Sequence, residues 1–411
     1  MISSLSRRQF VGAIGAASLV TARGYSAVTG ANERLRIGVI GAGGQATSHM
    51  EELVKMRDTD NFEIVNVCDI YTKRLDKAAQ LTGAKPVADY RRILDDKDID
   101  YVLIATPEHW HFQMAMDALD AGKHVYVEKP MTHTIEQGKK LVEKVKSSGR
   151  KLQVGVQGMS DESYAVANQH IKAGELGTVV LAQIDYSRNY QGDFWAGDDY
   201  PIDADAKPGV NLDWKAWLGP APKHDWDPER YFRWRRYWDY SGGIATDLFI
   251  HRATRLIKAL GLTFPEYVAA TGGKFEFKES IAEIPDTFNV LADYPEGLTM
   301  QLISSMANDA PVDHMIRGHK ATLYFTQTGF TIKPQEDYQK EMQPVTYEKK
   351  GAEDLTLHHR NLQAAIRANE PLNCDCFLGL YGVAVCDMAV ESMRKRQYLK
   401  WNSTKEQVEK A

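Results

Sequence analysis

Two residues of one predicted helix, Asp247 and His251, have side chains that could orient and move a proton. The apolar run from Ser241 to Leu260 contains the pair Gly242-Gly243 near its start, which predicts a helix entered through the glycines. Residues four positions apart project from the same face of a helix, so this carboxylate and imidazole should lie together. A base and an orienting carboxylate are what alcohol oxidation needs. The spacing also fits an ion pair on the helix surface beside a histidine whose ring is satisfied.

A third candidate is Lys129, in the run Glu128-Lys129-Pro130 after a strand-like segment, His124–Val127. An ammonium group there could stabilise the charge that develops on an oxygen atom as a hydroxyl is oxidised. The loop Thr106–His111 follows another strand-like segment in the same way. If these strands are parallel, both loops open at one edge of the sheet.

An alternation of strand and helix patterns indicates the sheet that must position Lys129. Strands are expected at Leu35–Ile40, Phe62–Cys68, Tyr101–Ala105, His124–Val127 and Leu152–Val156, with helices at Gln45–Arg57, Tyr71–Leu81, Glu108–Ala121 and Ile135–Ser148. This alternation specifies a doubly wound parallel sheet that binds ligands at the carboxyl ends of its strands. We therefore predict an α/β fold in which residues 31–157 form a Rossmann domain.

The first strand leads directly into a glycine-rich turn, Gly41-Ala42-Gly43-Gly44-Gln45-Ala46. In this G-x-G-x-x-A pattern Gly41 permits the tight turn, Gly43 lets the backbone approach a pyrophosphate, and Ala46 lets helix and strand pack closely. The N–H groups at the start of the next helix, around Gly44 and Gln45, can bind the phosphates. The pattern predicts a dinucleotide site.

The second strand ends at Asp69, where an acid can accept hydrogen bonds from the adenosine ribose. A carboxylate there repels a 2′-phosphate, which favours NAD over NADP as the cofactor. The nearby cations Lys73 and Arg74 weaken that preference. Asp69 could also cap the helix Tyr71–Leu81, and one residue can fill both roles.

Beyond Gly158 the pattern changes to longer strands with alternating side chains and short turns. Strands are expected at Thr178–Tyr186, Glu266–Thr271, Thr287–Tyr294, Leu298–Ser304, His314–Gly318 and Ala321–Thr326, with helices at Leu355–Ala368 and Gly379–Lys395. This pattern predicts a mostly antiparallel sheet with one open face, so residues 158–411 form a second, α+β domain. The open face could pair with another copy of the chain, which predicts a homo-oligomer.

A long segment without regular patterning, Tyr186–Tyr240, is rich in aromatic residues. It holds six of the eight tryptophans: Trp195, Trp214, Trp217, Trp226, Trp234 and Trp238. Long loops inside compact domains usually carry function, and aromatic faces stack on the C–H faces of sugars. Trp234 is therefore a candidate substrate contact, although some of these side chains would only fill space.

The composition excludes several classes of protein. A net charge of −5 and an isoelectric point near 6.2 argue against a nucleic-acid-binding surface. No apolar run approaches the roughly 20 residues that span a bilayer. The four cysteines form no CxxC pair and lie near no histidine cluster, so we expect no metal site.

The first 30 residues have the order of an export signal. Ser6-Arg7-Arg8-Gln9-Phe10 precedes an apolar stretch, Val11–Val20, with small residues near Ala22 and Ala27. An arginine pair followed by a polar residue and phenylalanine resembles the twin-arginine signal, which predicts export to the periplasm. A basic N-terminus without a targeting role is the alternative.

Taken in order, these motifs resemble the Gfo/Idh/MocA family of oxidoreductases over nearly the whole chain. The marks are the glycine turn, Ala105-Thr106-Pro107 with His111, the run from Ala121 to Pro130, and the Gly242-Gly243…Asp247…His251 helix. The resemblance implies that Thr106, Pro107, His111 and Glu128 lie at the cofactor. It also implies that Lys129 polarises the reacting hydroxyl beside the nicotinamide, that His251 is the general base, and that Asp247 positions it.

Three functions follow from the resemblance. The first is a sugar or polyol dehydrogenase with a tightly bound NAD. The second is an NAD-dependent glycosidase, in which transient oxidation allows elimination, water addition and re-reduction, with Tyr186 or Tyr190 assisting. The third is a non-catalytic protein that binds sugar and NAD. Lys129, which some glycosidase relatives replace, favours the dehydrogenase. His251 is followed by Arg252 and Thr254, whereas many dehydrogenase members of the family carry an acidic residue at the third position after the histidine.

Overall fold

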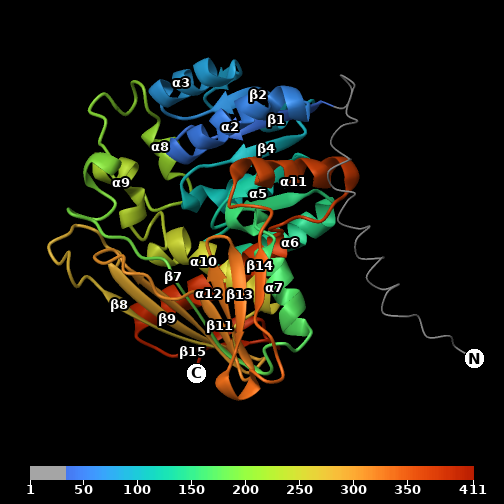
Figure 1. The fold of residues 1–411 in the computed structure, drawn as a ribbon. Helices are drawn as coiled ribbons and strands as arrows, with labels where there is room; N and C mark the ends of the chain where they lie inside the picture. The colour runs from blue at the N-terminus through green and yellow to red at the C-terminus, as the bar shows by residue number, and fades with distance from the viewer. Residues whose placement is uncertain (1–33) are drawn as a thin grey trace, which may run out of the picture.

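The computed structural model describes residues 34–411, which form two sheets and the helices that cover them (Figure 1). The first sheet is parallel throughout, in the order β3-β2-β1-β4-β5-β6. Its strands are β1 (Leu35–Ile40), β2 (Phe62–Cys68), β3 (Lys85–Val87), β4 (Tyr101–Ile104), β5 (His124–Glu128) and β6 (Leu152–Gly155). Its helices are α2 (Gly44–Asp60), α3 (Thr72–Thr82), α4 (Arg91–Asp95), α5 (His111–Asp120) and α6 (Ile135–Ser148). The predicted Rossmann-type sheet is confirmed.

Local sequence explains where several of these elements begin and end. Every residue of β4 is buried, as a central parallel strand requires. Helix α6 begins after Thr134, whose side chain accepts a hydrogen bond from the Gln137 N–H, and ends at Gly149 in the left-handed conformation. The helix expected from Glu108 instead starts with a 3₁₀ turn, Glu108–Trp110. Strand β3 and helix α4 went unpredicted because such short elements carry no periodic pattern.

The second sheet has the order β14-β13-β12-β11-β7-β10-β9-β8-β15-β16, and only β7 and β10 pair in parallel. Its strands are β7 (Val179–Asp185), β8 (Tyr267–Gly273), β9 (Thr287–Tyr294), β10 (Leu298–Ser305), β11 (Met315–Gly318), β12 (Ala321–Thr326), β13 (Gly329–Pro334), β14 (Val345–Glu348), β15 (Leu399–Asn402) and β16 (Gln407–Lys410). The accompanying helices are α7 (Ser163–Lys172), α8 (Trp214–Leu218), α9 (Pro228–Phe232), α10 (Ile250–Leu260), α11 (Leu355–Ala368) and α12 (Cys376–Lys395). The mostly antiparallel sheet is confirmed too.

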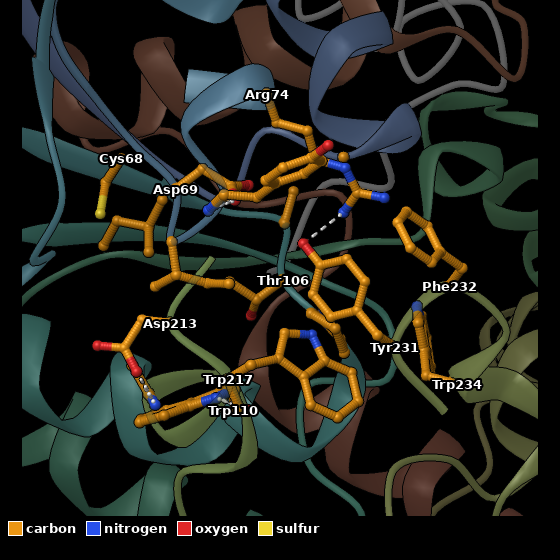
Figure 2. A pocket seen from close by; sticks show the side chains of 18 of the residues that line it. Cys68, Asp69, Arg74, Thr106, Trp110, Asp213, Trp217, Tyr231, Phe232 and Trp234 are labelled. Atoms are coloured by element: carbon orange, nitrogen blue, oxygen red, sulfur yellow. Dashed lines mark hydrogen bonds between the residues drawn. The ribbon is translucent and has the colours of Figure 1, made fainter. Parts of the chain in front are cut away.

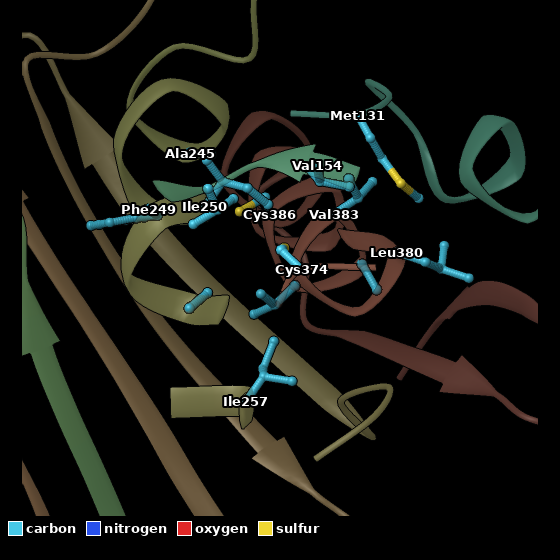
Figure 3. Close-up of a cluster of buried hydrophobic side chains, with 14 of the residues drawn as sticks. Met131, Val154, Ala245, Phe249, Ile250, Ile257, Cys374, Leu380, Val383 and Cys386 are labelled. Atoms are coloured by element: carbon cyan, nitrogen blue, oxygen red, sulfur yellow. The ribbon is translucent and has the colours of Figure 1, made fainter. Parts of the chain in front are cut away.

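Helix α12 lies in the core beneath this sheet (Figure 3). A Cβ atom at Gly379 would come within 2.7 Å of Val154, and one at Gly382 within 2.8 Å of Ile250, so both glycines permit close packing. The helix starts three residues earlier than predicted because the Asp375 side chain caps it. By length and composition α12 could cross a membrane, but 61% of its apolar window is buried inside the protein, as in a core helix.

Helix α11 returns from the C-terminal part of the chain and packs against α2 of the first sheet (Figure 1). Leu362 is fully buried in the same hydrophobic cluster as Ile37 and Leu103 of β1 and β4. Arg360 Nε lies 2.7 Å from Asp60 Oδ2 at the end of α2. Residues on both sides of the predicted boundary at 157/158 therefore share one hydrophobic cluster, and the boundary itself stays a prediction.

The predicted export signal, residues 1–30, lies outside the described residues.

Candidate functional site

A cavity of about 970 Å³ lies at the carboxyl edge of the first sheet (Figure 2). One side is formed by the glycine turn, by Asp69 and by Thr106-Pro107. The opposite side is formed by the segment 199–235, which enters from the second half of the chain with Tyr231, Phe232 and Trp234. We call residues 199–235 the covering segment. Its aromatic side chains enclose a space of the size that small-molecule and cofactor sites occupy.

The glycine turn has the geometry that a bound pyrophosphate requires. Gly41 adopts a φ of 95°, and a Cβ atom there would come within 2.7 Å of the Ala105 carbonyl oxygen. Gly43 and Gly44 leave open space, because nothing but the tip of Arg74 comes within 4 Å of a Cβ atom at either glycine. Both glycines and Gln45 line the cavity at the start of α2. Ala46, also predicted at the cofactor, does not line the cavity and is fully buried on the inner face of α2.

Asp69 lies beside this turn and holds it in place. Its Oδ2 atom accepts a hydrogen bond from the Ala42 N–H at 2.8 Å, and its Oδ1 atom accepts one from the Tyr71 N–H at 2.8 Å. Burial raises the pKa of this carboxyl, although the Arg74 charge and the backbone hydrogen bonds oppose that rise. Asp69 therefore lies where the ribose was expected. Asp69 does not cap α3, its alternative predicted role. Its side chain instead bonds the N–H of Tyr71, one residue before the helix.

The covering segment is tied to the residues that follow Asp69. Asp203 accepts a hydrogen bond from the Tyr71 hydroxyl at 2.9 Å and forms an ion pair with Lys73 at 2.7 Å. Asp205 is a second ion-pair partner of Lys73, at 2.9 Å. Arg74 lies over the Tyr231 ring, 5.2 Å from its centroid. The cation Lys73 is thus already paired with carboxylates, and Arg74 points into the cavity lining.

The predicted catalytic residues meet beyond one end of this cavity. Lys129 Nζ lies 2.7 Å from Asp247 Oδ1 and 3.0 Å from the Asp247 carbonyl oxygen. Arg235, which lines the cavity, places its Nε atom 3.0 Å from the same Oδ1. Burial would raise the pKa of Asp247, but the charges of Arg235 and Lys129 outweigh it and hold that pKa far below the usual range. Asp247 is therefore an anion that fixes two cations.

His251 is close to this group but does not bond to Asp247. Asp247 lies in a π-helical turn, Ala245–Phe249, ahead of α10, and its carboxylate is drawn to the two cations. Nδ1 of His251 is buried without a partner among residues 34–411. Burial and then the Lys129 charge lower the pKa of His251 to about 3. The expected pairing of Asp247 with His251 is thus replaced by Asp247 with Lys129 and Arg235.

Glu128 anchors the start of the Lys129 loop from below. Its Oε1 atom lies 2.8 Å from His49 Nε2 of α2 and accepts a hydrogen bond from Gln157 at 2.7 Å. Burial alone would raise the pKa of Glu128, but the hydrogen bond and charge of His49 and the charge of Lys129 bring it to about 2. Glu128 does not line the cavity. It holds together α2, β5 and the turn after β6.

The other predicted histidines brace loops. His111 is fully buried, with Nδ1 2.7 Å from the Pro130 carbonyl oxygen and Nε2 2.9 Å from the Thr106 carbonyl oxygen, so it joins the two loops at the site. The peptide bond between Lys129 and Pro130 is cis. His109 Nε2 lies 2.9 Å from the carbonyl oxygen of Trp217 in the covering segment. His111 thus positions Lys129 indirectly.

Of the two predicted substrate contacts, Trp234 lines the cavity, and Tyr186 lies against His251 with ring centroids 6.0 Å apart. Two important residues were not predicted. Arg235 is one of three arginines in the Phe232–Trp238 stretch, and no spacing distinguishes it from Arg233 and Arg236. Glu108 is buried and bonds Ser241, Gly242 and Thr246, which fixes the turn that leads to Asp247. No sequence pattern marked Glu108.

Among residues 34–411, no group of three or more His, Cys, Asp or Glu side chains could hold a metal ion.

Comparisons with known proteins agree with this architecture. A family model described as "Oxidoreductase family, NAD-binding Rossmann fold" matches residues 35–156. Two models described as "Oxidoreductase family, C-terminal alpha/beta domain" match residues 222–401 and 165–261.

Similar proteins include an inositol 2-dehydrogenase of Rubrobacter xylanophilus, 29% identical over 204 residues, which are 49% of this chain and 53% of that protein. A scyllo-inositol 2-dehydrogenase (NAD(+)) of Bacillus subtilis is 35% identical over 145 residues, 35% of this chain and 42% of that protein. A glycosyl hydrolase family 109 protein of a Shewanella species is 34% identical over 121 residues, 27% and 26% of the two chains. The chain matches about half the length of these relatives or less.

Solved structures share the fold at low sequence identity. A levoglucosan dehydrogenase in complex with NADH and levoglucosan has a TM-score of 0.70 at 18% identity, over 89% of this chain and 99% of that one. A putative myo-inositol dehydrogenase from Sinorhizobium meliloti has a TM-score of 0.62 at 21% identity, over 89% and 99%.

Proposed function

Because the chain belongs to the Gfo/Idh/MocA family of oxidoreductases, we propose that it transfers a hydride between a secondary hydroxyl of a sugar or polyol and NAD. One observation carries the proposal: Lys129, Asp247 and Arg235 form a charged group where a cavity lined by a dinucleotide turn ends. NAD, when bound, is the hydride acceptor.

The residues of the chain then have distinct roles. Lys129 donates a hydrogen bond to the reacting hydroxyl oxygen and stabilises the charge that develops on it. Asp247 and Arg235 hold the ammonium group in place. Burial and the Lys129 charge lower the pKa of His251 to about 3, so the ring is neutral and a ring nitrogen can accept a hydrogen bond from the reacting hydroxyl.

We propose NAD rather than NADP as the cofactor. Asp69 stands beside the glycine turn, and Asp203 and Asp205 neutralise Lys73. A 2′-phosphate would therefore meet the Asp69 carboxylate, and Lys73, a nearby cation that could bind it, is already paired with carboxylates. Denaturing the purified protein and identifying the released nucleotide by mass spectrometry tests this. Recovery of NADP would overturn it.

The first experiment on the reaction is mass spectrometry of products after incubation with disaccharides, aryl glycosides and inositols, without added cofactor. A dehydrogenase yields products two hydrogens lighter, together with an equal amount of reduced cofactor or acceptor. Cleaved glycosides without net oxidation would instead establish the second candidate, an NAD-dependent glycosidase. The similarity to a glycosyl hydrolase family 109 protein and the position of Tyr186 beside His251 keep that candidate open.

We also propose twin-arginine export to the periplasm, on the Arg7-Arg8 motif. Fractionation of cells that express the full chain tests it, with Arg7→Lys/Arg8→Lys as the control. Equal periplasmic amounts of both proteins would contradict this route.

A further inference from the structure

Arg252, the residue after His251, carries a guanidinium group that forms no ion pair with any of residues 34–411. It stacks on Tyr186, with Cζ 4.3 Å from the ring centroid. Its Nε atom is buried and bonds to nothing among the residues that the structure describes, where no carboxylate lies within ion-pair distance of the group. Burial and then the charge of Arg255 lower the pKa of Arg252, although Tyr186 and the Glu353 carboxylate oppose that change.

The two carboxylates that interact with Arg252 at longer range, Glu353 and Asp185, each pair with another residue. Glu353 pairs with Arg255 at 2.6 Å, and Asp185 pairs with His314 at 2.7 Å. A buried or partly buried charge without a partner is costly, so a protein normally pairs it or uses it. Among residues 34–411, neither of these carboxylates forms an ion pair with Arg252.

A second cation, Arg188, lies over the same tyrosine. Its Cζ atom is 5.6 Å from the Tyr186 centroid, and it donates a hydrogen bond to the Tyr190 hydroxyl at 3.3 Å. Arg188 also lacks a carboxylate partner among residues 34–411. The guanidinium groups of Arg252 and Arg188 therefore both lie against the Tyr186 ring, which packs edge-to-face with the His251 ring.

We propose that Arg252, assisted by Arg188, binds a carboxylate carried by the sugar substrate. The inference rests on the proposed function and makes it more specific: the substrate is a uronic acid or a uronoside rather than a neutral sugar. A guanidinium group binds a carboxylate through two parallel hydrogen bonds, and the stacked tyrosine fixes its plane. Because Arg252 directly follows His251, a carboxylate bound by Arg252 would lie within one sugar ring of the reacting hydroxyl.

Titration calorimetry of the NAD-loaded protein tests the proposal. The probes are methyl glucuronide, galacturonide and mannuronide, each against the neutral methyl glycoside of the same sugar, together with glucose 6-phosphate. In at least one pair the acid should bind ten times more tightly or better, and Arg252→Met should remove that preference. Arg252→Lys should restore it only in part, because an ammonium group cannot form the paired hydrogen bonds.

Arg394→Met is the matched control, because Arg394 is an exposed arginine that stacks on Trp238 at 4.8 Å, away from His251. It should keep the preference for the acid. No preference in any pair, or a preference that survives Arg252→Met in a folded protein, would overturn the proposal. Tighter binding of glucose 6-phosphate than of every uronide would overturn the carboxylate assignment.

The absorbance of reduced cofactor, followed in the same samples, separates this inference from the proposed function. Arg252-dependent binding of a uronide without any cofactor reduction or re-oxidation leaves the anion site standing and removes the dehydrogenase. Oxidation of a neutral sugar that is unaffected by Arg252→Met would leave the dehydrogenase standing and remove the anion site.

Discussion

The ammonium group of Lys129 has three hydrogens, and the structure accounts for two of them. One points to Oδ1 and one to the carbonyl oxygen of Asp247. Among residues 34–411 the third has no acceptor, so it remains for a substrate oxygen. Arg235 prevents Asp247 from rotating away because it bonds the same Oδ1 atom. Arg235 therefore fixes the Asp247 carboxylate, and Asp247 in turn fixes the orientation of the Lys129 ammonium group.

We expect Lys129→Met to lower kcat by a factor of about 100 to 1000, as loss of a donor to developing negative charge does. The KM value should change little, and the bound nucleotide should remain, because Lys129 does not line the cavity. Steady-state kinetics with nucleotide quantification measures both. Arg233→Met is the control. Arg233 lies two residues before Arg235 and pairs with Glu229, so this variant removes a cation but leaves Arg235 in place. A variant that keeps more than half of the wild-type kcat would contradict the role of Lys129.

The pH profile should lack an acid limb near the ordinary histidine pKa. Burial and the Lys129 charge lower the pKa of His251 to about 3, so the ring is neutral, and able to accept a proton, at every pH above about 4. Measured as kcat/KM between pH 5 and 8, activity should not fall with the protonation of this residue. Lys129→Met removes the positive charge and should raise the His251 pKa. An acid limb between pH 6 and 7 that disappears in His251→Asn would contradict this assignment.

At the scale of elements, the covering segment decides how the cofactor is held. It closes the cavity opposite the glycine turn and is fastened to the start of α3 by Asp203. Its aromatic residues pack among themselves, as Trp214 and Trp217 do with ring centroids 4.9 Å apart. A dinucleotide bound in this cavity would therefore lie between the glycine turn and the covering segment.

We expect Asp203→Ala to speed the release of bound NADH by several-fold to tenfold. The change removes the hydrogen bond of the buried Tyr71 and one ion pair, and a hydrogen bond of this kind contributes about 1 kcal/mol. Asp205→Ala removes only an exposed ion pair and should have a smaller effect. The decay of NADH fluorescence after dilution measures the rate. Equal rates for both variants and the wild type would show that the tether does not restrain the cofactor.

Sequence patterns predicted the elements well where the pattern was long. Strand β9 and helices α6 and α11 have the predicted limits, because periodic burial runs through each of them. Lys129 and Asp247 also lie together, with His251 close by, but Asp247 does not bond to His251. The partners of Asp247 could not be predicted, because Arg235 comes from an irregular segment whose path depends on tertiary packing. The same holds for Glu108.

At the scale of the molecule, stability should depend on Asp387, a partly buried acid of α12. Burial raises the pKa of Asp387 to about 6, although the carboxylate accepts a hydrogen bond from the Ile135 N–H at 2.8 Å. The native state therefore binds this proton more tightly than the unfolded chain does. This contribution to stability is present below the unfolded pKa, near 4, and is lost as pH rises through about 6.

Asp387→Asn should raise the melting temperature at pH 8 by a few degrees and leave it almost unchanged at pH 4. The asparagine oxygen can still accept the Ile135 hydrogen bond. The removed penalty is at most about 3 kcal/mol, from a shift of about two pKa units. Thermal unfolding of both proteins at the two pH values measures it. A loss of stability at pH 8 would mean that the charged form is favoured in the native state.

The open face of the second sheet should join two copies of the chain. Leu291 of β9, which pairs with Gln301 of β10, is a large apolar side chain that is 49% exposed on this face. We expect sedimentation velocity to show an oligomer and Leu291→Glu to dissociate it without loss of secondary structure. A monomeric wild-type protein would contradict the interface.

Helix α11 has a consequence for how the protein is made. The ribosome releases the dinucleotide-binding half first, yet Leu362 and Arg360, which complete its surface over α2, are synthesised near the end of the chain. The nascent first half therefore exposes a strip of its core until translation is almost finished. A nascent chain stalled before α11 should be digested by protease at α2, whereas the released protein is protected there.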